Sequence, residues 1–280
     1  MTDVEAILSE GVTLLKQLKP LLAVPAFISL LNFGEFLAVL DHRGSYIGIE
    51  FPLPAPVGDL WTFVNTPQQA SAGIGLTADG FLAVFPLAIA LVVAICYFLL
   101  YALLAAGYLG SIQQYRVRGS YDFLANAKQY AITYVALAVI LYGSMLVLVG
   151  IVAVMPPLLV ILLFVVLAIG YLFWGAWFLV PVANVGAIEA LVWSYDLATT
   201  ESDYVVWTLA HVVLGAMVSL LATWLVVTAS VVGLLIALAG VVPFGFVLTV
   251  GSLRVVDDLV RGRGRSRTNP GTTAGLGPRQ

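Results

Sequence analysis

Residues 120–130 read SYDFLANAKQY, and residues 194–204, 74 positions later, read SYDLATTESDY. Both stretches begin with Ser-Tyr-Asp, end in Tyr and lead into a long apolar run. Each also contains a short polar residue followed three positions later by a second polar side chain, which is the spacing of a helix-start cap. These pairs are Asn126 with Gln129 and Thr200 with Asp203. The repeat therefore predicts two equivalent elbows, each turning the chain at a membrane face before it re-enters the bilayer.

The composition is that of a membrane protein. Apolar residues make up 61% of the chain and charged residues 10%, against about half and about a quarter in a soluble domain. Several apolar runs reach about 20 residues, the length that a helix needs to cross the hydrocarbon core. Because the runs are continuously apolar rather than alternating, they favour helices over a transmembrane β-barrel. The sequence predicts an all-α, polytopic transmembrane helical bundle.

Three regions are expected along the chain. Residues 1–19 have apolar positions at helical spacing and predict an amphipathic interfacial helix. Residues 20–254 form the transmembrane domain, and residues 255–280 form a disordered basic tail, because their Gly-, Ser- and Arg-rich composition cannot bury a core. Six spans are predicted within the transmembrane domain. They are 21–40, 81–110, 130–154, 158–182, 204–228 and 231–253.

The connections between the spans differ in character. The Pro- and Gly-rich stretch 41–80 is expected to be an external loop, in which Asp59 caps a short helix and Trp61 and Phe63 dock on the bundle. The elbows occupy 111–129 and 184–203.

Eleven of the twelve basic residues fall on the side of the elbows. An excess of Lys and Arg marks the cytoplasmic face, so a cell-membrane protein with cytoplasmic N- and C-termini is predicted. Elbows on one side indicate two parallel elbow-plus-hairpin repeats rather than inverted ones. The N-terminal helix with the first span could form a third, diverged copy. Three lysines against nine arginines, with acids in excess, resemble the usage of salt-loving archaeal proteins.

The second elbow also carries a resemblance to known proteins. Residues 190–197, ALVWSYDL, resemble the Ala-Leu-x-x-Ser-x-x-Leu elbow of several six-helix membrane families. These include uncharacterised archaeal membrane proteins and the membrane domain attached to some glycerophosphodiester phosphodiesterases. The resemblance implies a fold type and a cytoplasmic elbow, and no activity, because the phosphodiesterase chemistry belongs to a separate soluble domain. The first elbow departs from this pattern, with RVRG at 116–119 before its serine.

Four polar residues in the predicted spans are candidates for an intramembrane site: Asn32, Glu35, Thr208 and His211. Ionisable groups inside a membrane often mark ion or proton pathways. Glu35 either lines a cavity and relays protons or reaches water near the end of its span. His211 shares a small and polar face with Thr208, so an interhelical hydrogen bond explains it as well as a functional role does.

The elbow side chains form the second candidate site. Asp122 and Asp196 are either paired carboxylates of an acid–base site or, as we favour, charges placed at helix amide ends. The first elbow is basic and the second acidic, so a cytoplasmic or membrane protein partner could be oriented by both. The residues expected to contact such a partner are Arg116, Arg118, Ser120, Asp122, Ser194, Asp196, Glu201 and Asp203.

Four tail arginines, Arg261, Arg263, Arg265 and Arg267, alternate with Gly and Ser. Next to a membrane they are expected either to attract anionic lipid head groups, at about 1 kcal/mol each, or simply to fix the topology. Nucleic acid is not an expected partner, because the tail lacks aromatic residues for base stacking.

The sequence contains no motif for a metal site, a cofactor or a known catalytic centre. We therefore favour a non-enzymatic membrane protein that is a permease-like, transport-accessory or scaffolding subunit. A membrane-embedded enzyme acting on a lipid, through Glu35, His211 or the elbow aspartates, is the alternative. A pocket converging on two of those side chains would favour the enzyme.

Overall fold

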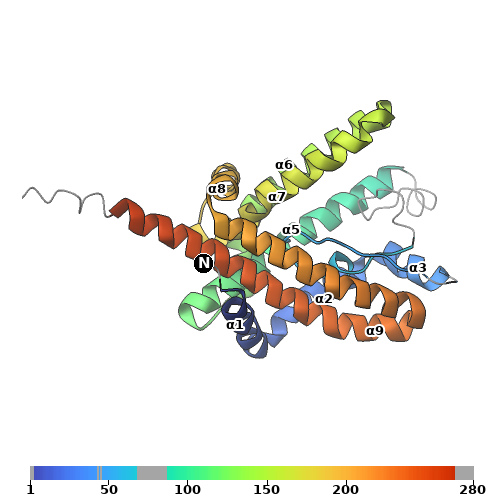
Figure 1. Ribbon diagram of the computed structural model, residues 1–280, viewed down its shortest axis with the longest axis horizontal. Helices are drawn as coiled ribbons and strands as arrows, with labels where there is room; N and C mark the ends of the chain where they lie inside the picture. Colours follow the sequence, from blue (N-terminus) through green and yellow to red (C-terminus); the bar gives the residue numbers. More distant parts are fainter. Residues whose placement is uncertain (1–2, 43, 45, 68–86, 269–280) are drawn as a thin grey trace, which may run out of the picture.

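The computed structural model describes residues 3–42, 44, 46–67 and 87–268. Every regular element in these residues is helical, which confirms the all-α class. Four of the helices are long and apolar enough to cross a membrane, or five if the pair Val4–Gln17 and Lys19–Leu31, bent by 96°, counts as one broken span. In Figure 1 the long helices spread from a common end, with α5 between the α6–α7 pair and α9.

The central helices are α5 (Leu87–Arg118), α6 (Phe123–Val154) and α7 (Leu159–Ala183). The bounds of α7 match the predicted span within one residue, whereas α5 ends eight residues later and α6 begins seven residues earlier than predicted, so most of the predicted first elbow, 111–129, is helical. The turn between α6 and α7 is the short 3-10 helix η3 (Pro156–Leu158), at the Pro-Pro pair that predicted a break. A proline lacks a backbone N–H and cannot continue a preceding helix, so the pair ends α6.

The last element, α9 (Ser202–Thr268), is a helical hairpin. Its backbone leaves the helical region at Ser230 (φ 48°, ψ −124°), where the chain turns back. The two legs then run antiparallel, since the Trp207 indole N–H donates to Ser252 Oγ at 2.9 Å. The fifth and sixth predicted spans, 204–228 and 231–253, are these two legs.

The first predicted span, 21–40, is not one continuous helix. It is divided at Asn32 into α2 (Ala23–Leu31) and α3 (Phe33–Asp41), each nine residues long. At 1.5 Å per residue, either piece is too short to cross a hydrocarbon core of about 30 Å. The 3-10 helix η1 (Lys19–Leu22) connects α2 to the preceding helix.

The N-terminal helix, α1 (Val4–Gln17), has its predicted helical form, and Asp3 caps it by accepting from the Ala6 N–H. Its buried face, formed by Ile7, Gly11 and Leu14, packs on the second leg of α9. Because that face contacts protein, α1 is part of the bundle rather than a helix that only rests on lipid.

The two elbows are built differently. The first is a short turn between α5 and α6, and Gly119 adopts a left-handed conformation (φ 72°) that stops α5. The second contains the separate helix α8 (Ala187–Thr200). In Figure 1, α8 and α1 lie on opposite sides of α9 but at the same end of the molecule, opposite the α6–α7 turn and the α9 bend.

Two predictions about chain ends and caps are wrong. The helix α9 continues to Thr268, so residues 255–268 are helical rather than disordered; residues 269–280 lie outside the described part. Asn126 is inside α6, whose cap is Asp122, and Thr200 is the last residue of α8 rather than a cap of α9. A capping residue must precede the first helical turn; α6 begins directly after its cap Asp122, earlier than a cap at Asn126 would place it, and α9 begins at Ser202, later than a cap at Thr200 would place it.

Candidate functional site

An extended segment, residues 46–67, follows α3 in the chain and packs against α2 and α9. Its only regular element among the described residues is the 3-10 helix η2 (Leu60–Thr62), which Asp59 caps as predicted. Leu60, Phe63 and Val64 are at most 1% exposed. The docking that the sequence predicted for Trp61 and Phe63 is therefore confirmed, and most of the segment from position 52 onward is buried, whereas Ile47, Ile49 and Phe51 stay exposed. Residues 68–80 lie outside the described part.

Hydroxyl groups of the helices satisfy the backbone donors of this segment. The N–H of Glu50 donates to Ser219 Oγ at 2.7 Å and that of Asn65 donates to Thr223 Oγ1 at 2.9 Å. The N–H of Leu60 donates to Ser29 Oγ at 2.9 Å. All three hydroxyl residues are fully buried. An unpaired buried N–H costs about 1–3 kcal/mol, so these hydroxyls stabilise the irregular segment here.

The proline spacing of the segment serves the same purpose. Positions 52, 54 and 56 are prolines, which have no backbone N–H and so leave no donor to satisfy.

Further along, Gly58 meets Gly245 of α9, and a Cβ on Gly58 would lie 3.0 Å from the Gly245 Cα. Only glycine on both sides lets the two backbones approach this closely.

Two buried carboxylates lie at this segment: Glu35 comes from α3, and Asp59 is part of the segment itself. The Thr66 hydroxyl donates to Glu35 Oε2 at 2.5 Å, and the hydroxyl and N–H of Thr62 donate to Asp59 Oδ1 at 2.5 and 3.1 Å. Asp59 belongs to the connecting segment and not to a spanning helix. Burial raises the pKa of its carboxyl to about 6; the bonds from Thr62 oppose this shift and the nearby charge of Glu35 adds to it.

A second group of polar side chains joins the beginning of the segment to its end. The Asn65 amide donates to the Glu50 carboxylate, and the Tyr46 hydroxyl donates to the Asn65 carbonyl oxygen. Burial, together with the charge of Glu50, raises the pKa of Tyr46. Sequence reasoning placed Glu50, Asn65 and Thr66 in an external loop and so missed them as site residues. The alternation of prolines was the signal that could have indicated a buried segment.

The four predicted intramembrane residues do not all gather at this segment. Glu35 does, through its bond from Thr66, and it is 6% exposed there rather than in water. Asn32 instead accepts from the Tyr97 hydroxyl of α5 at 3.4 Å. Thr208 instead accepts from the Trp174 indole at 3.0 Å and donates to a backbone carbonyl of its own helix. His211 is buried next to Trp207, and its Nδ1 has no hydrogen-bond partner in the described residues. The interhelical hydrogen bond, one of the two explanations for His211, is thus not seen at that atom.

The basic residue of the first elbow that should face a partner is already paired. Arg116 is only 10% exposed and forms ion pairs with Glu10 of α1 at 2.9 Å and with Asp257 of α9 at 3.3 Å. Arg254 also pairs with Glu10, at 2.9 Å. These bonds join α1, α5 and the second leg of α9. Arg118 is exposed and is the elbow arginine that a partner could contact.

The serines and aspartates of the repeated triplet have different surroundings. Ser120 is exposed, and Asp122 caps α6 by accepting from the Ala125 N–H at 3.0 Å. Ser194 is fully buried within α8 and donates to the Leu172 carbonyl at 2.7 Å. Asp196 lies in the middle of α8, so the predicted capping role holds for the first aspartate and is wrong for the second.

Asp196 and Glu201 instead hold an arginine of the predicted tail. Arg263 pairs with Asp196 and, at 2.9 Å, with Glu201. Burial alone would lower the pKa of Arg263, but the bonds and charges of these two carboxylates raise it. The acidic elbow is therefore partly neutralised by the chain itself. Asp203 lies in the first turn of α9, where a negative charge favours the helix start.

The remaining tail arginines are only partly described. Arg261 pairs with Asp257 at 2.9 Å and stays 60% exposed, so it can still reach a lipid head group. Arg265 and Arg267 lie in the last turns of α9, and their side chains are outside the described part. In the described residues, no group of three or more His, Cys, Asp and Glu side chains is placed to hold a metal ion.

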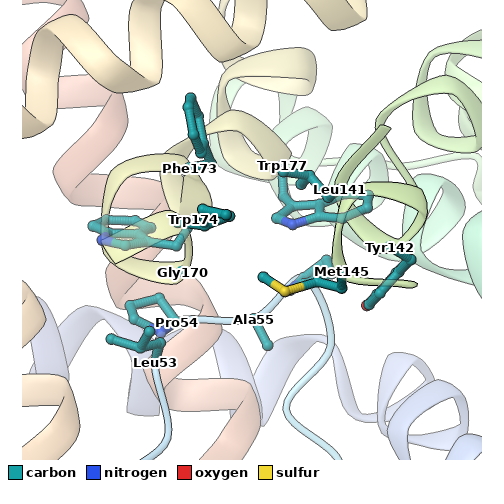
Figure 2. Close-up of a pocket in the computed structure, with 12 residues that line it drawn as sticks. Leu53, Pro54, Ala55, Leu141, Tyr142, Met145, Gly170, Phe173, Trp174 and Trp177 are labelled. Carbon is teal, nitrogen blue, oxygen red and sulfur yellow. The ribbon is translucent and has the colours of Figure 1, made fainter. Parts of the chain in front are cut away.

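A cavity of about 210 Å³ lies beside the tip of the entering segment. Leu53 to Pro56 form one wall, and side chains of α6 and α7 form the others; Figure 2 shows the tip next to Trp174 and Trp177. The lining residues do not include Glu35, His211, Asp122 or Asp196. The site thus comprises an irregular segment with buried carboxylates on one side and an apolar cavity on the other.

The chain matches no protein-family model, no curated protein and no solved structure.

Proposed function

We propose that this chain is a permease-like membrane protein in which segment 46–67 handles the transported species. The observation that carries the proposal is an irregular, carboxylate-bearing segment enclosed by long apolar helices. Non-helical backbone at membrane depth is tolerated where protein encloses it or where it lines a cavity. In many transporters, such backbone at broken helices forms the substrate and ion sites. The break at Asn32, between α2 and α3, lies against this same segment.

The carboxylates supply the chemistry of this proposal. Glu35 is 6% exposed and Asp59 is 8% exposed, and buried ionisable groups in a membrane bundle mark ion or proton pathways. Each accepts from a threonine hydroxyl, and both threonines belong to the entering segment. A movement of that segment would break the bond from Thr66 to Glu35 of α3 and would move Asp59 relative to Glu35. We assign to Glu35 and Asp59 the binding of a proton or cation that accompanies transport.

The finer topology belongs to the same proposal. Six spans result when the broken α2–α3 pair counts as the first and the legs of α9 count separately. The common end of α1, both elbows and the second leg of α9 is then cytoplasmic, because it collects the basic residues. The order helix, elbow, helix occurs in α5–α6 and again in α7–α8–α9, which supports parallel repeats. The relation to the six-helix families rests on the elbow motif alone.

Two other functions are weaker candidates. A lipid-directed enzyme would need the cavity to present the candidate acids or His211, and its walls present apolar groups instead. A scaffolding or transport-accessory subunit would dock a protein at the exposed elbow residues Arg118 and Ser120. Loss of a copurifying protein on Arg118→Glu, with unchanged thermal stability, would favour the scaffold.

Flux measurements in liposomes test the permease proposal. The purified full-length protein is reconstituted with a pH-sensitive dye inside, and a pH gradient is imposed with and without a membrane potential. We expect the wild type to dissipate the gradient faster than Glu35→Gln or Asp59→Asn. Glu189→Gln, which changes an exposed carboxylate on α8, is the matched control. Equal rates for the wild type, the two variants and empty liposomes would reject proton or cation handling by these acids.

A further inference from the structure

The cavity beside the entering segment has walls from three elements. Leu53, Pro54, Ala55 and Pro56 come from the tip of the segment. The α6 wall consists of Leu141, Tyr142 and Met145, and Gly170, Trp174 and Trp177 are among the residues that α7 contributes. In Figure 2 the tip residues lie below the two indoles, and Met145 reaches in from the side of α6.

The chemistry of the walls selects against water and polar solutes. The lining contains no ionisable acid or base, and its polar side-chain groups are the Tyr142 phenol and the two indoles. The Trp174 indole N–H already donates to Thr208. A buried water needs two to four polar partners, and genuinely apolar cavities stay dry. The cavity is therefore suited to a hydrocarbon.

The cavity lies where lipid chains are the available hydrocarbon. Its walls come from the middle of α6 and α7, two helices that are long and apolar enough to span a membrane. The neighbouring side chains Leu146 and Phe164 are 61% and 66% exposed, so the outer faces of both helices point to lipid. Leu141, Met145 and Phe173 in the lining are only half-buried, which leaves the cavity continuous with that lipid-facing surface.

We propose that this cavity binds the end of one acyl chain of a membrane lipid. Its volume of about 210 Å³ corresponds to about seven groups the size of a water molecule, at roughly 30 Å³ each. That is enough for the terminal methylenes of a chain and too little for a helix of a second protein. The rest of the lipid stays in the bilayer against α6 and α7.

The bound chain touches the segment that carries the carboxylates. It packs on Leu53 to Pro56, a few residues before Asp59, and so favours the inserted position of the segment. Lipid binding of this kind stands on the cavity alone. It does not require that the protein transports anything, so the flux measurement and the test below can fail independently.

A photoreactive phospholipid tests the proposal. The full-length protein is placed in bilayer nanodiscs that contain a phospholipid with a diazirine near the end of its acyl chain, and crosslinked residues are mapped by mass spectrometry. We expect crosslinks on the peptides that contain residues 53–56 and Met145, in addition to lipid-facing positions such as Leu221 of α9. Absence of crosslinks at the tip in the wild type would overturn the proposal outright.

Variants that fill the cavity sharpen the result. Ala55→Phe fills it from the tip and Met145→Trp from the opposite wall, while Leu163→Phe adds similar bulk on the exposed face of α7. Each added side chain occupies the space that the acyl chain fills in the wild type. We therefore expect loss of the crosslinks at the tip for each filling variant that keeps the wild-type crosslinks at Leu221, and no loss for Leu163→Phe. Unchanged tip crosslinks in either folded filling variant would refute binding in the cavity.

Discussion

The backbone N–H of Leu60 donates a hydrogen bond to the hydroxyl of Ser29, at a distance of 2.9 Å. The same serine donates to the Pro25 carbonyl at 2.7 Å, and its own carbonyl accepts from the Trp61 indole at 2.8 Å. One buried residue of α2 therefore fixes both the backbone and the largest side chain of η2. This junction is where the irregular segment is attached to the helical bundle.

Ser29→Ala should destabilise the protein because it leaves the Leu60 N–H buried without an acceptor. The cost of such an unsatisfied donor is about 1–3 kcal/mol. Ser144→Ala is the matched control, since Ser144 is exposed on α6 and donates only to the nearby Leu141 carbonyl. Thermal unfolding in detergent measures both. Equal midpoints for the two variants would show that the segment is not held at this junction.

The stability of the protein should fall as pH rises from about 4 to about 6. The carboxyl of Asp59 has a pKa of about 6 in the folded protein and about 3.9 when unfolded. Below both pKa values the carboxyl is protonated in the folded and the unfolded state, so it does not change the free energy of unfolding. Above both it is ionised in either state, and the folded state alone carries the cost of burying the charge. The difference of about two pKa units lowers the free energy of unfolding by about 3 kcal/mol above pH 6.

Asp59→Asn tests the assignment of this pH dependence. The amide keeps an acceptor for Thr62, which donates to the Asp59 carboxylate from both its N–H and its hydroxyl, but it does not titrate. Unfolding followed between pH 4 and pH 7 should therefore show a flatter profile for Asp59→Asn than for the wild type or for the exposed control Glu189→Gln. Parallel profiles in all three would assign the dependence to other groups.

Arg116→Ala and Arg118→Ala should differ strongly although the two residues are two positions apart. Arg116 is largely buried between Glu10 and Asp257, and removing one member of a buried ion pair costs about 3–5 kcal/mol. Arg118 is exposed, and a surface substitution there should change stability by no more than about 0.5 kcal/mol. Unfolding in detergent compares them. A similar small effect for both would mean that the contacts to α1 and α9 contribute little.

Much of the fold could be predicted because long apolar helices are local features. The predicted boundary between the spans 130–154 and 158–182 is found between α6 and α7, because the Pro-Pro pair there cannot continue a helix. The break of the first span at Asn32 could not be predicted in this way. The residues next to it in the structure, Tyr97 on Asn32 and Leu60 on Ser29, are distant in sequence.

The candidate site was only half predictable for the same reason. Glu35 stood out as an acid inside an apolar run, but Asp59 and Glu50 were in a stretch whose composition resembles that of an external loop. Its burial depends on hydroxyls that lie 31, 158 and 169 residues away along the chain. Those serines and threonines looked like ordinary residues of apolar helices. No local pattern distinguishes a loop in water from one whose donors are satisfied by distant side chains.

The two copies of Ser-Tyr-Asp should respond unequally to the same substitution. Ser194 is enclosed where α8 meets α7, next to Gly175 and the Tyr204 ring, so Ser194→Leu overpacks a close contact at a cost of about 1–3 kcal/mol. Ser120 is exposed in the first elbow, and Ser120→Leu should change stability by less than about 0.5 kcal/mol. Thermal unfolding midpoints in detergent compare the stability of the two variants. Matching losses in both copies would instead indicate that the elbows are structurally equivalent.

Accessibility labelling tests the orientation of the helices in the membrane. Cys96 is exposed and has to be replaced first; single cysteines are then introduced at Ser120, Glu189 and Met155. Ser120 and Glu189 lie at the common end with the elbows, and Met155 lies at the opposite turn between α6 and α7.

Because α6 and α7 each span the bilayer in the proposed topology, a membrane-impermeant maleimide applied outside intact cells should label Met155→Cys alone. The other two should react only after the membrane is opened, since the excess of basic residues places their end in the cytoplasm. Labelling of all three from outside would show that α6 and α7 do not cross the membrane. Labelling of Ser120→Cys and Glu189→Cys from outside, with Met155→Cys protected, would keep the spans and reverse the orientation.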